Sequence, residues 1–284
     1  MQGKGKQESQ STGRLPVIVV KYGGNAMRSF ELQEQTLEAI ASMHGSRCRV
    51  VLVHGGGPFI AQTLDTARIE SDFASGQRKT SPEAMPWIEM ALKGNVNGRL
   101  VRISQNLGIN AVGLSGKDGK VAIAEKYWID ETNRTLDLGQ VGRIKTINTR
   151  LLKTLLDGGF FPILCCVALG EDGLDYNVNA DVFASAVAGA IHADAFVLLT
   201  DVDGLREDVE DPDSLVSDIS AEEAQKLVEN GVVKGGMIPK LQACVDALNS
   251  GVGACFILNG MKPERLTDLM NGTTVATRIT LNHG

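Results

Sequence analysis

PVIVVKYGG (residues 16–24) is an apolar, largely β-branched run that ends in Lys21 and a glycine pair. RVVLVHGGGP (residues 49–58) repeats the pattern and ends in three glycines and a proline. Continuous apolar runs of this kind are typical of strands buried on both faces of a sheet. Further runs alternate with helical patterns, the strands at 110–114, 161–167, 195–200 and 254–258 and the helices at 83–107, 180–191, 221–230 and 238–249. The alternation predicts an α/β fold with a mainly parallel central sheet.

One segment departs from this alternation. Residues 120–147 (KVAIAEKYWIDETNRTLDLGQVGRIKTI) hold two alternating stretches around a polar Asp-Glu-Thr-Asn-Arg turn, which predicts a hairpin outside the main sheet. No Pro- or Ser-rich linker divides the chain. We therefore expect a single domain over residues 15–284. The polar, low-complexity residues 1–14 are expected to form a disordered tail.

The composition argues against several classes of protein. A formal charge of −6 offers no excess of cations for nucleic-acid phosphates, so no nucleic-acid partner is expected. The longest apolar runs have the length of strands rather than of membrane spans, so no membrane association is expected. The five cysteines form no CxxC pair, which indicates neither zinc nor disulfides and favours a reducing cytoplasm. Cys165 and Cys166 lie in the apolar run PILCCVAL and are expected to be buried, inert thiols.

The two glycine-rich strand ends are candidate anion sites. Gly23 and Gly24 allow backbone to approach an anion beside the fixed cation of Lys21. The second turn, residues 55–58 (GGGP), lies at an expected helix start, where several N–H groups point at one spot. Ligands bind beyond the carboxyl ends of parallel strands, so both turns are expected to face one crevice. A plain strand-to-helix connection is the alternative. The spacing excludes a P-loop and a GxGxxG dinucleotide fingerprint.

Other polar residues have both a functional and an ordinary interpretation. Asp201 follows a predicted strand, where it suits a ribose or a nucleotide loop, and the surrounding D-x-D-G spacing lacks the ligands of a calcium loop. Lys240 is expected in the first turn of a helix, where an ammonium is often simply solvated. Arg78 lies in a predicted loop, where it is either exposed or clamps a carboxylate.

Residues 175–181 (DYNVNAD) place short polar side chains at alternate positions before a helix. Helix capping explains one of them, most simply Asn179 or Asp181, but not the whole set. The four histidines are scattered and have no acid partner in any visible pattern, and the expected spacings of metal ligands are missing. We therefore expect no protein-bound metal, and we expect His54 to order the glycine turn that follows it rather than to donate protons.

Nine segments in order resemble the amino acid kinase family, and within it the members that phosphorylate N-acetyl-L-glutamate. The segments are KYGGNAM (21–27), VHGGGPFI (53–60), FASGQRKT (73–80), ALKGNVNGRLV (91–101), GLSGKDG (113–119), DLGQVGRI (137–144), DYNVNADVFA (175–184), LLTDVDGL (198–205) and GGMIPKLQAC (235–244). The resemblance implies a three-layer αβα sandwich. It also implies an N-terminal lobe of about residues 15–178 for the acyl-amino-acid substrate and a C-terminal lobe of about 179–284 for ATP.

The resemblance implies transfer of the ATP γ-phosphoryl group to the γ-carboxylate of N-acetyl-L-glutamate, a step of arginine synthesis. Lys21 and Lys240 match the catalytic lysines that neutralise the phosphoryl group, and Asp181 matches the catalytic aspartate that orients them. The implied substrate-binding residues are Gly56, Gly57, Arg78 and Asn177. The implied nucleotide-binding residues are Gly23, Gly24, Thr200, Asp201, Val202, Gly204, Val232, Lys234 and Met237. Mg²⁺ would be held mainly by ATP phosphates and water.

Residues 257–280 lack the Asp-Gly-Arg and Gly-x-Gly-Thr pattern of arginine-inhibited members, and the N-terminal tail does not resemble their amphipathic helix. We therefore expect a homodimer without arginine control. The alternatives are another amino acid kinase, acting on an aminoadipate derivative, carbamate or uridylate, or a non-catalytic nucleotide-binding regulator. Retention of both lysines and the aspartate argues against a regulator, because a sensor needs no charges for phosphoryl transfer.

Overall fold

The computed structural model describes residues 14–282 except 132–133, 209–210, 212 and 274. Residues 1–13 of the expected tail lie outside the described residues. Arg14 is described, and its guanidinium lies 3.1 Å from the carboxylate of Asp194.

The main sheet contains eight strands in the order β12-β14-β13-β11-β1-β2-β8-β5. Neighbouring strands are parallel except β13 and β14, which are antiparallel. The predicted α/β fold with a mainly parallel sheet is confirmed. The strands are β1 (Val17–Tyr22), β2 (Arg49–His54), β5 (Ala111–Ser115), β8 (Phe161–Cys165), β11 (Ala195–Thr200), β12 (Asp218–Ser220), β13 (Ala254–Asn259) and β14 (Thr277–Thr280).

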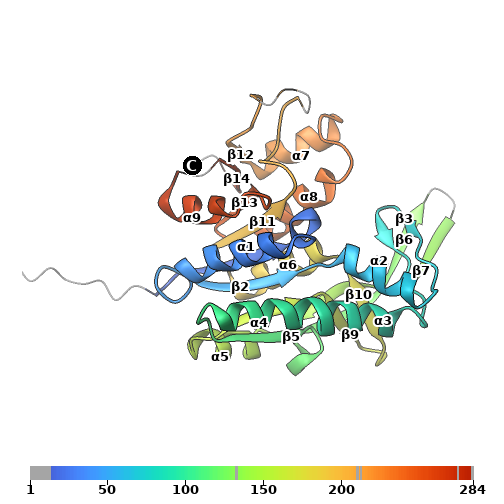
Figure 1. The fold of residues 1–284 in the computed structure, drawn as a ribbon. Helices are drawn as coiled ribbons and strands as arrows, with labels where there is room; N and C mark the ends of the chain where they lie inside the picture. The colour runs from blue at the N-terminus through green and yellow to red at the C-terminus, as the bar shows by residue number, and fades with distance from the viewer. Residues whose placement is uncertain (1–13, 132–133, 209–210, 212, 274, 283–284) are drawn as a thin grey trace, which may run out of the picture.

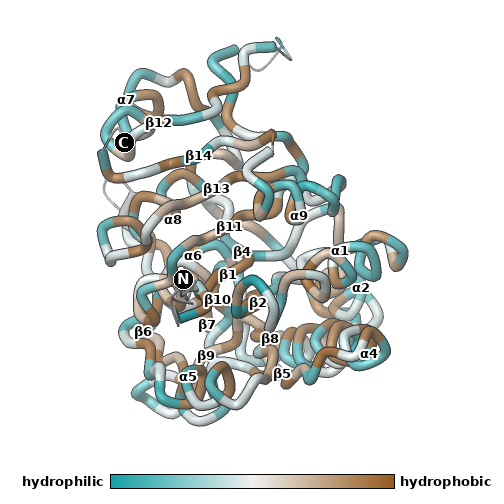
Figure 2. Tube along the Cα trace, turned by 90° about the vertical axis from the view of Figure 1, so that its left-hand side faces the viewer, coloured by the Kyte–Doolittle hydropathy of each residue, from teal (hydrophilic) through white to brown (hydrophobic). Residues whose placement is uncertain are grey.

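Helices cover both faces of this sheet, which confirms the three-layer αβα sandwich. Figure 1 shows the fold, and Figure 2, turned by 90°, shows α8, α6 and α5 on one side of the strands and α9, α1 and α4 on the other. The α-helices are α1 (Phe30–Met43), α2 (Gly57–Thr66), α3 (Met85–Glu89), α4 (Gly98–Asn106), α5 (Arg150–Asp157), α6 (Ala180–Ile191), α7 (Ala221–Glu229), α8 (Met237–Asn249) and α9 (Glu264–Asn271). The shorter helical segments are η1 (Gly24–Met27) and η3 (Asp118–Lys120), both 3₁₀.

The core explains why the strands read as continuous apolar runs. Every residue of β1 is buried, and successive side chains enter opposite layers. Val19 belongs to the cluster that contains Phe183 of α6, whereas Val20 belongs to the cluster that contains Leu37 of α1. Full burial of each such side chain contributes roughly 1.5–3 kcal/mol, so both faces of the strand select apolar residues.

The predicted helix over residues 83–107 is one continuous helical segment with an unpredicted register change. Between α3 and α4 the chain forms a π-helix, η2 (Met90–Asn97). Its sequence, MALKGNVN, includes Gly94 and two asparagines, which have lower helix propensity than alanine or leucine. π-Segments inside α-helices re-aim side chains and frequently occur at functional sites.

A second, smaller sheet forms a closed barrel in the order β10-β7-β6-β9. The predicted hairpin over residues 120–147 is confirmed as antiparallel β6 (Ala122–Glu131) and β7 (Arg134–Ile147). The prediction of one strand over 161–167 is wrong at its end, because β8 stops at Cys165 and β9 (Val167–Gly170) belongs to the barrel with β10 (Asp175–Val178). The bend falls at Cys166, whose thiol donates to the carbonyl oxygen of His54 at 3.4 Å.

The carboxyl ends of β1, β2, β8 and β11 meet at one edge of the main sheet because these four strands are parallel. A short hairpin of β3 (Phe73–Ala74) and β4 (Gln77–Arg78) lies near this edge. The edge therefore brings together the glycine turns, the hairpin and the start of α6.

Candidate functional site

The glycine turns after β1 and β2 are joined to each other. The N–H of Gly55 donates to the carbonyl oxygen of Tyr22 at 2.9 Å, which places the two turns side by side. Gly24 has a φ of 74°, a left-handed conformation that favours glycine. A Cβ on Gly56 would lie 2.7 Å from Cδ2 of Leu92, so a side chain there would require Leu92 to shift. The expectation that both turns face one crevice is confirmed, because Gly23, Gly24 and residues 55–57 line the same cavity.

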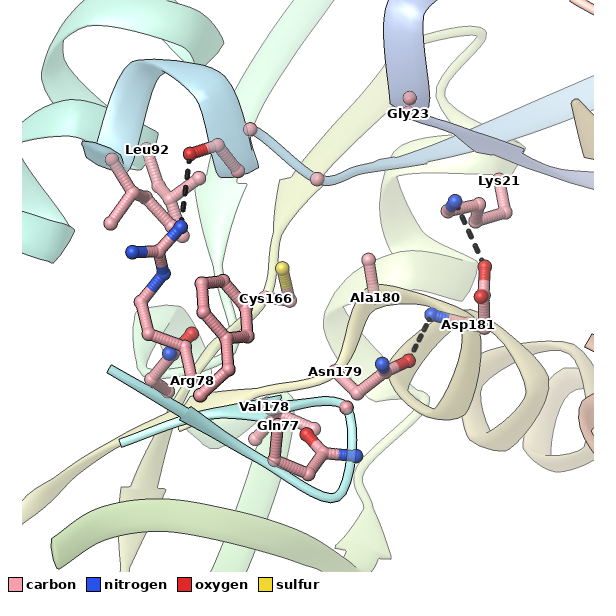
Figure 3. Close-up of a pocket in the computed structure, with 18 residues that line it drawn as sticks. Lys21, Gly23, Gln77, Arg78, Leu92, Cys166, Val178, Asn179, Ala180 and Asp181 are labelled. Atoms are coloured by element: carbon pink, nitrogen blue, oxygen red, sulfur yellow. Dashed lines mark hydrogen bonds and ion pairs between the residues drawn. The ribbon is translucent and has the colours of Figure 1, made fainter. Parts of the chain in front are cut away.

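This first cavity has a volume of about 220 Å³. Its walls include all four residues expected to bind the acyl-amino-acid substrate, namely Gly56, Gly57, Arg78 and Asn177. Figure 3 shows Arg78 on one side of the cavity and the Lys21–Asp181 pair on the opposite side, with Cys166 and Ala180 between them. The cavity thus has a cationic group at each end.

Arg78 is held in place by its surroundings. One guanidinium nitrogen donates to the carbonyl oxygen of Gly57 at 3.2 Å, another donates to the hydroxyl of Ser71, and the group stacks over the ring of Phe73 at 4.5 Å. Burial lowers the pKa of this guanidinium, which nevertheless stays protonated in proteins.

Asn177 donates from Nδ2 to the hydroxyl of Thr80 at 3.2 Å. An oriented guanidinium and an oriented amide are suited to one carboxylate.

A buried ionic cluster forms the other end of the cavity. Nζ of Lys21 lies 2.9 Å from Oδ1 of Asp181, and Nζ of Lys240 lies 3.0 Å from Oδ2 of the same carboxylate. The side chains of Lys21 and Asp181 are 8% and 7% exposed, and that of Lys240 is 23% exposed. Burial alone would raise the pKa of Asp181, but the two ammonium groups outweigh it and hold this pKa below its ordinary value. The cluster carries two positive charges and one negative charge at neutral pH.

The position of Asp181 follows from the start of α6. The N-cap of this helix is Asn179, whose Oδ1 accepts from the N–H groups of Asp181 at 2.8 Å and Val182 at 3.3 Å. Asn179 is thus the capping residue of the two that the sequence allowed. Asp181 lies in the first turn, where the partial positive charge of the helix N-terminus stabilises a carboxylate.

A second cavity of about 440 Å³ lies on the other side of this cluster and includes Lys240 in its wall. Seven of the nine residues expected to bind the nucleotide line it, namely Thr200, Asp201, Val202, Gly204, Val232, Lys234 and Met237. The other two, Gly23 and Gly24, line the first cavity instead.

The turn after β1 contacts the walls of both cavities. The N–H and Nδ2 of Asn25 donate to the carboxylate oxygens of Asp201 at 3.0 and 2.9 Å. Gly24 therefore packs against a residue of the second cavity, since a Cβ on it would lie 2.8 Å from Oδ1 of Asp201. Sequence reasoning did not single out Asn25. The signal was its place directly after the two glycines.

The sequence did not indicate a place in the site for two further residues, Cys166 and Asn97. Cys166, expected to be an inert buried thiol, lines the first cavity, and burial raises its pKa to about 12. Asn97, at the end of η2, contacts His54 beneath the second glycine turn, with Nδ2 and Nε2 separated by 3.0 Å. Burial lowers the pKa of His54 to about 4, so its imidazole is neutral at physiological pH. A neutral histidine that contacts the turn agrees with an ordering role.

Among the described residues no group of three or more histidine, cysteine or acidic side chains is placed to hold a metal ion. The described helices include none that is both long enough and apolar enough to cross a membrane. The walls of the two cavities include lysines, an arginine and glycine backbone, which suit anionic ligands.

Comparison with known proteins agrees with this geometry. The pattern of the "Amino acid kinase family" matches residues 16–259. An acetylglutamate kinase of Clostridioides difficile (strain 630) is 40% identical over 263 residues, 92% of this chain and 90% of the relative. One from Caldanaerobacter subterraneus subsp. tengcongensis is 42% identical over 243 residues, 86% of this chain and 80% of the relative.

Among solved structures, N-acetylglutamate synthase from Neisseria gonorrhoeae, complexed with coenzyme A and N-acetyl-glutamate, has a similar fold. Its TM-score is 0.80 at 22% identity, and the match covers 95% of this chain and 61% of that one. At this identity the likeness concerns the fold alone, whereas the matches at about 40% identity extend over most of both chains. The chain belongs to the amino acid kinase family, and within it to the acetylglutamate kinases.

Proposed function

We propose that this enzyme transfers the γ-phosphoryl group of ATP to the γ-carboxylate of N-acetyl-L-glutamate and forms N-acetylglutamyl 5-phosphate for arginine biosynthesis. The observation that carries the proposal is the Lys21–Asp181–Lys240 cluster, in which one buried carboxylate holds two ammonium groups between two cavities. Phosphoryl transfer needs positive charge at the group in flight and little covalent help from the protein.

The shape of the first cavity supports a substrate with two carboxylates. Arg78 and Asn177 would bind the α-carboxylate, and the γ-carboxylate would lie toward Lys21, within reach of the glycine turn that holds Gly56 and Gly57. The second cavity, about twice as large, would hold ATP against residues 200–206 and 232–237. Residues of about 15–178 would thus serve mainly the acyl amino acid and residues of about 179–284 mainly the nucleotide.

The reaction balances without a general base. A carboxylate is ionised at pH 7, so one of its oxygens attacks the γ-phosphorus directly while the bond to the β,γ-bridging oxygen breaks and ADP leaves. Lys21 and Lys240 would lower the energy of the negative charge that spreads over the transferred group, and Asp181 would fix their directions. Mg²⁺, held mainly by ATP phosphates and water, would neutralise further charge. Both Gly23 and Gly24 would then bring backbone close to the phosphates between the two cavities.

The test is a direct assay of acceptors. The protein is incubated with Mg-ATP and N-acetyl-L-glutamate, the acyl phosphate is trapped as a hydroxamate, and ADP release is followed in parallel. N-acetyl-L-aspartate, aminoadipate derivatives, carbamate and UMP serve as competing acceptors. We expect hydroxamate and ADP with N-acetyl-L-glutamate far above the other acceptors. Hydroxamate formation only with another acceptor, or with none, would overturn the proposal. The homodimer and the cytoplasmic location remain predictions.

A further inference from the structure

The second glycine turn is held from below by a chain of buried polar groups. Asn97, 2% exposed, lies between the carbonyl oxygen of Ile163 and the ring of His54, which is fully buried. Nδ2 of Asn97 lies 2.9 Å from the Ile163 oxygen and 3.0 Å from Nε2 of His54. Nδ1 of His54 lies 2.8 Å from the carbonyl oxygen of Gly55. These contacts connect strand β8 of the main sheet to the glycine turn.

The positions of the hydrogens in this series of polar groups follow from the carbonyl oxygens at its two ends, those of Ile163 and Gly55. A carbonyl oxygen only accepts, so the Asn97 atom that faces Ile163 must be the NH₂ group. The same NH₂ group then faces Nε2 of His54, which must accept and therefore carries no hydrogen. In a neutral imidazole the hydrogen is then on Nδ1, and Nδ1–H donates to the carbonyl oxygen of Gly55. One tautomer satisfies every contact, and the low pKa of His54 agrees with a neutral ring.

The bond to Gly55 decides where the following amide points. The Gly55–Gly56 peptide is trans, so the Gly55 oxygen and the Gly56 N–H point in opposite directions. His54 holds the oxygen on the buried side, so the Gly56 N–H is directed away from the buried chain, at a position that lines the first cavity. The turn cannot shift easily, because Gly56 is packed against Leu92 of η2, the same π-helix that ends in Asn97.

We propose that His54, held in its Nδ1–H tautomer by Asn97, is a positioning residue that aims the N–H group of Gly56 at the carboxylate receiving the phosphoryl group. The inference rests on the proposed function. In this proposal a buried tautomer sets the direction of the backbone donor. Such a donor stabilises the reacting carboxylate only if its direction is fixed before the reaction. This role would also explain the π-helix, because its register places both Leu92 and Asn97 under the same glycine turn.

The matched variants are His54→Asn and His54→Gln. An asparagine amide can occupy the place of Nδ1–H and donate to Gly55, whereas a glutamine amide reaches the place of Nε2 and leaves Gly55 without its donor. We expect H54Q to lower kcat about 100-fold, in the range for a lost or misdirected backbone donor, with the KM for ATP unchanged. H54N should recover most of kcat. Melting temperatures of both variants and calorimetric Kd values for N-acetyl-L-glutamate separate positioning from folding and from ground-state binding.

A measurement on the unaltered enzyme does not depend on the folding of any variant. Two-bond ¹⁵N–¹H spectra of protein with ¹⁵N-labelled histidine report the tautomer of each ring, and loss of one signal in H54N assigns His54. A hydrogen on Nε2 would overturn the proposal, as would a folded H54Q with nearly unaltered kcat, or equal losses in H54Q and H54N. If the unaltered enzyme forms no acyl phosphate from N-acetyl-L-glutamate, the proposed function fails. If the unaltered enzyme is active and H54Q has nearly the same kcat, only the positioning role of His54 is refuted.

Discussion

Replacing Asp181 with asparagine tests the ionic cluster directly. The substitution keeps the size of the side chain but removes the charge that compensates Lys21 at 2.9 Å and Lys240 at 3.0 Å. Lys240 is 23% exposed and can turn to water, whereas Lys21 is 8% exposed and cannot. The main cost is therefore an uncompensated ammonium at Lys21. Breaking one side of a buried pair costs about 3–5 kcal/mol, and the remaining amide oxygen places D181N near the lower end, at about 3 kcal/mol.

This free energy converts into a measurable change of melting temperature. For a chain of this size, about 1 kcal/mol shifts Tm by roughly 2–4 °C, so D181N should melt about 6–12 °C lower. Activity should fall further than stability suggests, because a small displacement of a catalytic group costs about 100-fold in rate. We expect kcat to fall by about this factor, with the KM values for both substrates little altered.

The dependence on pH separates the charge from other effects. The pKa of Asp181 is lowered in the folded state, so the carboxylate stabilises the protein above its ordinary pKa of 3.8, and this stabilisation is lost as pH falls through the lower folded value. The Tm difference between the unaltered enzyme and D181N should therefore be constant near neutrality and shrink only below about pH 4.

A surface pair provides the control. Glu171 lies 2.6 Å from Lys145, with side chains 62% and 43% exposed. E171Q should leave both Tm and kcat nearly unchanged, because an exposed ion pair contributes little to stability. Scanning calorimetry and the hydroxamate assay on both variants complete the test. A D181N protein with unaltered Tm and kcat would refute the reasoning, and a lowered Tm with unaltered kcat would reduce the cluster to a structural ion pair.

Three further substitutions probe single contacts. Lys240→Ala should lower kcat far more than it raises the KM for N-acetyl-L-glutamate, and an effect on KM alone would contradict its role in phosphoryl transfer. Arg78→Lys should raise the KM for the acyl amino acid about 10-fold or more, measured by steady-state kinetics, because one ammonium cannot reproduce the oriented guanidinium. Gly56→Ala should lower kcat/KM, because the added Cβ would lie 2.7 Å from Leu92. The additional change Leu92→Val should restore part of the loss. An unaltered kcat/KM in G56A would show that the turn tolerates a side chain.

The fold was predictable because its main signals are local. A strand such as β1 is buried on both faces, so nearly every position has to be apolar, and its end is marked by a lysine and glycines. The missed strand boundary at Cys166 has a physical reason. The run PILCCVAL is apolar on both sides of the bend, and the bend depends on the thiol contact with the carbonyl of His54 and on the barrel beyond it.

The site was predictable only in part. The sequence pattern alone indicates an anion site at Lys21 and the glycine turns, because a cation and accessible backbone amides are next to each other in the sequence. Lys240, by contrast, is 59 positions from Asp181, and its ammonium acquires a defined place only when α6 and α8 pack. The resemblance to the family supplied that residue. Neither source indicated the contact of Asn97 with His54, which depends on the register of a π-helix.

The arrangement of charge explains why an acidic protein can handle two anionic substrates. The chain carries a formal charge of −6, yet the cluster at Lys21, Asp181 and Lys240 has a net charge of +1, from two ammonium groups and one carboxylate. Without Asp181 the two ammonium groups would repel each other, and the buried ammonium of Lys21 would lose its counter-charge at 2.9 Å. The carboxylate therefore does not cancel the catalytic charge. It keeps two cations close together, charged and directed at the place where the phosphoryl group passes.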